Sequence, residues 1–354
     1  MASGCSLVCE GCGQPVQAGD RFCRNCGQPL TRQPKRKPAS PAFVRYLQRA
    51  RRIADGEPAP EPPKPVRFDD VAGLGDLKRT LMEIAMVVQG RGPKGLRPWR
   101  AVMLFGPPGT GKTLIARALA GELGWYFRAA SGSDFKSKWY GESEQNLHSL
   151  FEDARERAPS VVFLDEVDNV SGQRSGNASD SVLTQLLQEI EGFTVSSRPV
   201  LLMAATNLPW ALDEAFVSRM ERRILVPLPD AAGREEILRL YTRGFPLEDG
   251  MDFADLARRS EWRSGRELER ICQDAAVEVW RESGYDPERV RPVGAKDFHQ
   301  AIDRNPPLTT NDLLRKHEQW AERYGTDGRK PAGDGAGSVR RMAAARAAGP
   351  PVAV

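Results

Sequence analysis

The stretch Gly106-Pro107-Pro108-Gly109-Thr110-Gly111-Lys112-Thr113 predicts the fold class of this chain. It follows the apolar run 101–105 and precedes a helical pattern over 114–120, which together form the strand, glycine-rich loop and helix of a P-loop. In this context the glycines let backbone N–H groups turn towards phosphates at a helix N-terminus. Lys112 can reach the β- and γ-phosphates, and Thr113 can place its hydroxyl on Mg²⁺. The eight residues are therefore predicted to bind a nucleoside triphosphate.

Two further apolar runs end in polar residues that suit phosphate chemistry. Residues 160–164 lead into Asp165 and Glu166, the Walker B form, and residues 200–205 lead towards Asn207. Asp165 can hold the water shell of Mg²⁺, and Glu166 can polarise the attacking water. An amide at Asn207 can orient that water against the γ-phosphate. We therefore predict ATP hydrolysis with Mg²⁺ as cofactor, with Mg²⁺ residues Thr113 and Asp165 and catalytic residues Glu166 and Asn207.

Residues 66 to about 325 resemble a single AAA ATPase module of the classical clade. The similarity is strongest to the branch that contains katanin, spastin, fidgetin and the ESCRT-disassembling ATPase. Beyond the P-loop, the Walker B run and Asn207, the resemblance rests on Phe68-Asp69-Asp70-Val71-Ala72-Gly73-Leu74, Ser137-Lys138-Trp139-Tyr140-Gly141-Glu142-Ser143-Glu144, Leu212-Asp213-Glu214-Ala215, Arg219-Met220-Glu221-Arg222-Arg223-Ile224 and Leu228-Pro229-Asp230. Residues 306–313 and 320–325 are similar to the last helix of that branch.

The resemblance implies an α/β fold in which a five-stranded parallel sheet is flanked by helices. We expect this large subdomain at 66–229, a small helical lid at 230–308 and a C-terminal helix at 309–328. The sequence pattern agrees, because strand and helix patterns alternate up to residue 229 and mainly helical patterns follow.

The resemblance also implies a ring of identical subunits, usually a hexamer, with ATP between neighbours. Arg219 matches the family's arginine finger, which acts in trans, and Arg222 matches a second arginine found in some members. A surface salt bridge is the alternative for each arginine. Asp70 and Gly265 match nucleotide-binding positions of the family.

The aromatic pair Trp139 and Tyr140 suggests how such a ring would act on a substrate. Lys138, Trp139 and Tyr140 match the family's first pore loop, in which the first aromatic grips an extended polypeptide. The alternative for Trp139 is a core position, which the flanking polar residues disfavour. The leading hypothesis is a motor that remodels, unfolds or disassembles protein substrates by threading them through pore loops.

Two departures limit what the resemblance carries over. Ser218 stands where the microtubule-severing branch usually has another arginine. Arg266 stands where the classical clade mostly has a small residue, and it either contacts the γ-phosphate from the lid or forms a salt bridge at a helix start. Residues 1–65 do not resemble the front domains of that branch, so no substrate is implied.

Four cysteines near the N-terminus have the spacing of a zinc site. They form two CxxC pairs, each leading into glycine, and tetrahedral Zn²⁺ in structural sites takes four such thiolates. We expect a zinc-ribbon-like segment over residues 1–30 whose metal supplies its folding energy, with ligands Cys9, Cys12, Cys23 and Cys26. A redox role is the alternative, and no thioredoxin-like pattern surrounds the pairs.

The excess of positive charge lies in the first 65 residues of the chain. Residues 1–65 carry 11 Lys and Arg against 5 Asp and Glu, whereas the rest carries 40 against 42. We read 31–65 as a basic Pro-rich linker with a short helix or a solvated tether, and 329–354 as a disordered tail. The basic segment leaves open a nucleic-acid-associated ATPase that uses ATP as a loader or switch. With no apolar run of about 20 residues and no signal-peptide core, we expect a cytoplasmic protein without membrane insertion.

Overall fold

The computed structural model describes residues 65–135, 142–171, 179–195, 199–286 and 290–326, together with residues 7–8, 12, 14–16, 23 and 25–26. The chain forms two compact units, Met1–Lys64 and Pro65–Val354. The predicted linker, apart from Pro65, and the predicted tail at 329–354 lie outside the described residues. No helix in the described part is long and apolar enough to cross a membrane.

The larger unit is built on a parallel sheet in the order β4-β5-β6-β3-β7. The strands are β3 (Ala101–Phe105), β4 (Tyr126–Ser131), β5 (Ser160–Asp165), β6 (Val200–Thr206) and β7 (Arg222–Leu225). The pairings β4–β5, β5–β6, β6–β3 and β3–β7 are all parallel. The predicted five-stranded parallel sheet flanked by helices is confirmed.

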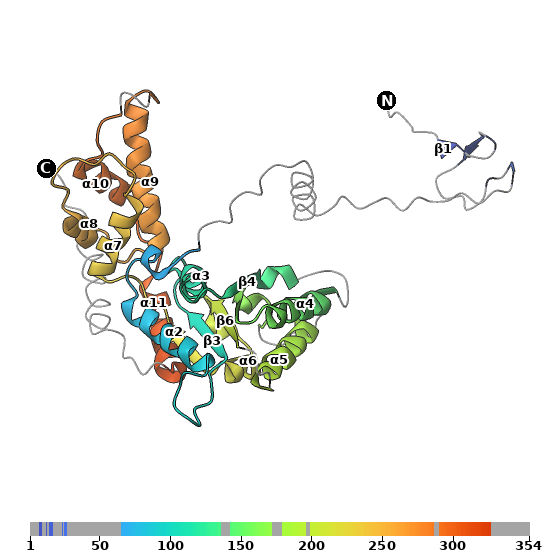
Figure 1. Cartoon of the computed structure of the whole chain (residues 1–354). Helices are drawn as coiled ribbons and strands as arrows, with labels where there is room; N and C mark the ends of the chain where they lie inside the picture. Colours follow the sequence, from blue (N-terminus) through green and yellow to red (C-terminus); the bar gives the residue numbers. More distant parts are fainter. Residues whose placement is uncertain are drawn as a thin grey trace. The chain divides into compact units, whose positions relative to one another are not determined.

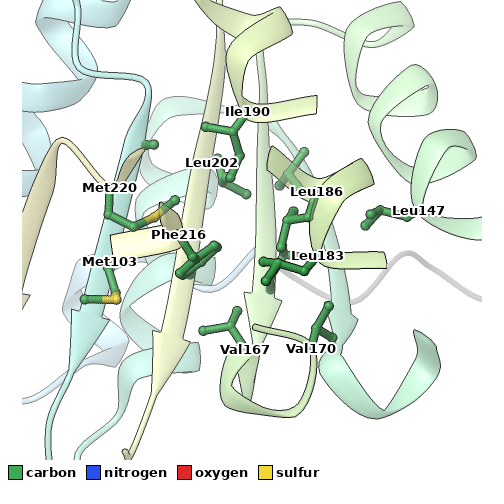
Figure 2. Close-up of a cluster of buried hydrophobic side chains, with 14 of the residues drawn as sticks. Met103, Leu147, Val167, Val170, Leu183, Leu186, Ile190, Leu202, Phe216 and Met220 are labelled. Carbon is green, nitrogen blue, oxygen red and sulfur yellow. The ribbon is translucent and has the colours of Figure 1, made fainter. Parts of the chain in front are cut away.

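Side chains alternate between two apolar cores, one on each face of the sheet. Along β3, Met103 and Phe105 enter one core, and Val102 and Leu104 enter the other. Helices α2 (Gly75–Val88) and α3 (Lys112–Leu123) cover the second face, and α4 (Glu142–Glu156), α5 (Ser179–Val195) and α6 (Glu214–Arg219) cover the first. Figure 2 shows the first core, where Phe216 and Met220 lie among aliphatic side chains from β6, α4 and α5.

The sheet subdomain also contains short 3-10 helices in the segments that precede or connect its strands and α-helices. They are η1 (Phe68–Asp70), η2 (Gly132–Phe135), η3 (Val167–Asn169) and η4 (Pro209–Ala211). Helix η3 directly follows the Walker B acids, so the chain turns at the carboxyl end of β5. Because β3, β5 and β6 run parallel, the polar residues that follow them lie at one edge of the sheet.

Four helices form a separate apolar cluster after the sheet (Figure 1). They are α7 (Ala231–Tyr241), α8 (Phe253–Arg259), α9 (Gly265–Glu282) and α10 (Ala295–Arg304). Side-chain caps at Asp230 and Ser264 satisfy free N–H groups where α7 and α9 begin. Cys272 lies fully buried on α9 within this apolar cluster, and burial raises the pKa of its thiol to about 12.

A last helix, α11 (Asn311–Tyr324), returns to the sheet subdomain. Trp320 packs edge-on against Phe105, with ring centroids 4.6 Å apart. Arg223 of β7 donates from its Nε to the Tyr324 carbonyl at 2.6 Å, and the Thr326 N–H donates to the Arg223 carbonyl at 3.0 Å. The end of the described chain is therefore fixed against the strand next to the P-loop strand.

The smaller unit is described at only a few residues. Strands β1 (Leu7–Val8) and β2 (Pro15–Val16) pair antiparallel. The Sγ atoms of Cys12, Cys23 and Cys26 all lie within 4.8 Å of one another, and Cys9 lies outside the described residues.

Candidate nucleotide site

The P-loop follows β3 and opens α3, as its sequence predicts. All three of its glycines have backbone conformations that side chains rarely adopt, with φ of 150° at Gly106, 77° at Gly109 and 89° at Gly111. A Cβ atom at Gly106 would lie 2.2 Å from the Val226 carbonyl oxygen, and one at Gly109 would lie 2.7 Å from Ser264 Oγ. The loop therefore needs glycine for both its turn and its close neighbours.

Lys112 is buried inside this loop. Its Nζ donates to the Gly106 and Pro107 carbonyls at 2.9 and 2.8 Å. Burial lowers the pKa of Lys112 to about 8, against the attraction of Asp165 and with added repulsion from Arg266. The ammonium thus donates to loop carbonyls at a point where a bound anion would further stabilise its charged form.

Thr113 and Asp165 meet at the start of α3 and the end of β5. The Thr113 hydroxyl donates to Asp165 Oδ2 at 2.7 Å. A hydroxyl and a carboxylate oxygen side by side are the hard ligands that Mg²⁺ prefers, and Mg²⁺ commonly uses only one or two protein oxygens beside substrate phosphates. The residues present therefore fit the predicted ion.

Glu166 turns sharply out of β5. Its φ is 50°, an uncommon left-handed conformation for a non-glycine residue. Its side chain is exposed and accepts from Asn169 Nδ2 at 3.3 Å, while its N–H donates to Asp165 Oδ1 at 3.0 Å. This turn separates the two carboxylates, so that one faces Thr113 and the other is open to solvent.

Asn207 follows the neighbouring strand β6. Thr206 just before it donates to Asp168 Oδ1 at 2.7 Å, which ties this loop to the Walker B turn. Among the described residues, no group pairs with the buried Oδ1 of Asn207. A buried, unpaired amide oxygen is costly, so this atom is suited to a ligand or water.

These groups share one cleft of about 1330 Å³ between the sheet edge and the helices α7, α9 and α11. Asp70 and Gly265, the two positions taken from the resemblance, also line it. Across the cleft, the Arg266 N–H donates to the Gly109 carbonyl at 3.2 Å. The structure thus brings together the predicted P-loop, Mg²⁺, glutamate and asparagine residues.

The two candidate finger arginines lie away from this cleft. Arg219 ends α6, where its half-exposed guanidinium pairs with the exposed Glu191 at 2.6 Å. Arg222 stacks over the Trp99 ring at 4.3 Å and donates to the Thr326 carbonyl at 3.1 Å. Arg219 is available at the surface, whereas Arg222 contributes to fixing the chain after α11.

The other predicted site residues fall partly outside the described chain. Lys138, Trp139 and Tyr140 lie there, as does Cys9. The Sγ atoms of Cys12 and Cys23 are 3.6 Å apart, close to the ~3.8 Å that follows from zinc–sulfur bonds of about 2.3 Å in a tetrahedral site. This one pair of thiols is therefore spaced as two zinc ligands would be, and the zinc site stays a prediction.

Sequence reasoning missed one residue at the cleft, His317. It is buried on α11, lines the cleft, and lies 3.0 Å from the Asn207 carbonyl through its Nε2. Its partner is 110 residues away, so no local spacing marks the contact. Only the similarity of residues 306–313 and 320–325 to a family helix pointed to this region.

Comparison with known proteins agrees with the geometry. A family model described as "ATPase family associated with various cellular activities (AAA)" matches residues 102–228. The chain is 38% identical over 288 residues to the katanin p60 ATPase-containing subunit A1 of Arabidopsis thaliana, covering 74% of this chain and 55% of that protein. It is 37% identical over 308 residues to the meiotic spindle formation protein mei-1 of Caenorhabditis elegans, covering 80% and 64%. The chain therefore spans only about half to two thirds of these relatives.

A solved structure is similar over the larger unit. The FIGL-1 AAA domain in complex with ADP superposes with a TM-score of 0.66 at 31% identity, over 73% of this chain and 91% of that one. That domain binds its nucleotide in the crystal, and the shared fold carries the P-loop described above.

Proposed function

The chain belongs to the AAA family of ATPases, and from this premise we propose that it hydrolyses ATP between neighbouring copies in a ring and thereby remodels a polypeptide. The observation that carries the proposal is the convergence of Lys112, Thr113, Asp165, Glu166 and Asn207 on one cleft. Phosphoryl transfer depends mainly on positioning and charge stabilisation, and these side chains supply both.

Each residue has a distinct part in the proposed reaction. Lys112 turns from the loop carbonyls to the β- and γ-phosphates when ATP enters. Thr113 and Asp165 hold Mg²⁺, which neutralises phosphate charge when bound. Glu166, which is exposed and turned away from Asp165, polarises the attacking water. The Asn207 amide, whose buried Oδ1 has no partner among the described residues, orients this water.

The site is completed by Arg219 of a neighbouring copy. Within one copy Arg219 forms the surface salt bridge that was the alternative, and the role in trans rests on the match of Arg219 to the family's finger. An ion pair between exposed side chains contributes little and exchanges readily, so it leaves Arg219 free to reach a neighbour. The similarity to a protein named for meiotic spindle formation supports action on a protein assembly, and no observation on the described residues favours the nucleic-acid alternative.

Two parts of the proposal concern segments that the structure describes only in part or not at all. Trp139, with Lys138 and Tyr140, grips the substrate in the ring. The cysteine segment binds zinc and, with the basic residues that follow, selects the substrate or an adaptor; the spacing of Cys12, Cys23 and Cys26 supports the metal.

The test is a Glu166→Gln variant of the full chain. We expect ATP binding close to wild type and turnover lower by about 100-fold or more, because the water loses its base. The control is Lys112→Ala, which should lose nucleotide binding itself. Turnover by Glu166→Gln equal to that of the wild type would contradict the catalytic assignment.

The same variant tests the remodelling step with a fluorescent unfolded polypeptide as probe. Glu166→Gln with ATP should retain this probe, and adding Trp139→Ala should weaken retention about tenfold while ATP binding is unchanged. Equal retention by the two proteins would exclude Trp139 as the gripping residue.

A further inference from the structure

His317 is a buried histidine at the nucleotide cleft, and the steps above do not use it. Its side chain is almost fully buried, with the residue 1% exposed, and its ring packs edge-on against Trp210 with centroids 5.0 Å apart. Nδ1 lies 2.8 Å from the Leu313 carbonyl of its own helix. Nε2 lies 3.0 Å from the Asn207 carbonyl of the loop after β6. The His317 ring therefore joins α11 to Asn207, the asparagine proposed to orient the attacking water (the sensor residue).

Of the two ring-nitrogen contacts given above, the one through Nε2 leads from α11 to another element, and the one through Nδ1 stays within α11. Burial, and to a lesser degree the charge of Lys112, lowers the pKa of His317, although backbone bonds to Leu313, Asn207 and Gly106 oppose this. At neutral pH the imidazole is therefore uncharged and has one N–H to donate. A proton on Nε2 binds the Asn207 carbonyl, whereas a proton on Nδ1 stays within α11.

The loop that carries Asn207 is fixed from two sides. Thr206 donates to Asp168, and the Leu208 N–H donates to Thr206 Oγ1 at 2.9 Å. The Asn207 carbonyl is fixed instead by α11, which Trp320 anchors against Phe105 beside the P-loop. With its backbone fixed on this side, Asn207 can present its buried Oδ1 to the cleft, where no described residue pairs with it.

We propose that His317 is a positioning residue, whose Nε2–H bond to the Asn207 carbonyl sets the sensor amide and makes the docked C-terminal helix part of the hydrolysis site. This inference rests on the proposed ATP hydrolysis. Because His317 acts through Asn207, its loss should change turnover and leave nucleotide binding intact.

The test compares His317→Gln with His317→Asn in the full chain. A glutamine amide nitrogen can take the place of Nε2, and an asparagine amide can take only the place of Nδ1. We expect His317→Gln to keep at least half of the wild-type kcat, and His317→Asn to lose about tenfold, with ATP binding unchanged in both. Equal kcat in the two variants, or a loss in His317→Asn that appears as weaker ATP binding, would overturn the proposal.

Hydrogen–deuterium exchange separates this inference from the proposed function. In the nucleotide-free full chain, amides of residues 206–212 should exchange as slowly in His317→Gln as in the wild type, and faster in His317→Asn. If the wild type does not hydrolyse ATP, the proposed function fails. Hydrogen–deuterium exchange of residues 206–212 would still report whether the contact between His317 and Asn207 forms. Equal protection of this loop in both variants would overturn the inference.

Discussion

Arg266 is a second cation beside the P-loop lysine. Its backbone N–H bonds Gly109, its charge contributes to lowering the pKa of Lys112, and among the described residues its guanidinium has no hydrogen-bond or ion-pair partner. Two neighbouring cations over a phosphate loop repel each other until an anion lies between them. The arrangement favours the γ-phosphate contact over the salt bridge that the sequence left open.

Arg266→Ala should weaken ATP binding about tenfold and ADP binding much less, since it removes one charge-assisted hydrogen bond to the terminal phosphate. Titration of both nucleotides measures this. The matched control is Arg270→Ala, one turn along α9, where the exposed arginine lies near Asp274. An equal loss for ATP and ADP would count against a γ-phosphate contact.

For single residues, the sequence predicts those contacts whose partners lie within one motif or at the ends of neighbouring parallel strands. Lys112 and Thr113 belong to one loop, and Asp165 and Asn207 end buried strands, so the parallel sheet brings them to one edge. The contact of His317 with Asn207 depends on how α11 docks, and that docking leaves no local pattern.

The C-terminal helix α11 is the element whose docking matters most. Trp320 of this helix is 8% exposed and belongs to the apolar core next to Phe105. The resemblance indicated a last helix that returns to the large subdomain. It could not indicate that Leu314, His317 and Ala321 line the nucleotide cleft, because that depends on the angle at which α11 packs.

Trp320→Ala should destabilise the larger unit by ~3–5 kcal/mol, because truncation of a buried aromatic leaves a cavity beside the P-loop strand. Chemical denaturation gives the free energy of unfolding. Trp280→Ala on α9, where the ring is 44% exposed, is the control and should cost under about 1 kcal/mol. Similar losses in the two variants would show that α11 is not part of the core.

The whole molecule joins an ATPase unit to a small cysteine-rich unit. The fold of the larger unit follows from its sequence, because alternating strand and helix patterns and the P-loop restrict it to a parallel sheet. A segment as short as the cysteine-rich one over residues 1–30 can bury little apolar surface, so its sequence predicts little beyond a metal site.

The purified full chain should contain about one zinc per subunit, and Cys12→Ser or Cys26→Ser should lower this content at least tenfold. Metal analysis after chelator dialysis measures it. The matched control is Cys5→Ser, because Cys5 lies outside the two CxxC pairs. Thermal unfolding of the ATPase unit should be unchanged, since Met1–Lys64 is a separate compact unit. A chain that contains no zinc before chelation would rule out the ribbon.

The central claim is that each ATP site is completed by Arg219 of a neighbouring copy, and mixing two inactive variants tests it most directly. Glu166→Gln lacks the base but supplies the finger, and Arg219→Ala keeps the base but supplies no finger. Each alone should turn over ATP at least about 100-fold more slowly than the wild type. A mixture should recover turnover, because an intact Arg219→Ala site then receives Arg219 from its Glu166→Gln neighbour. A mixture that is no faster than the two variants measured separately would contradict the account.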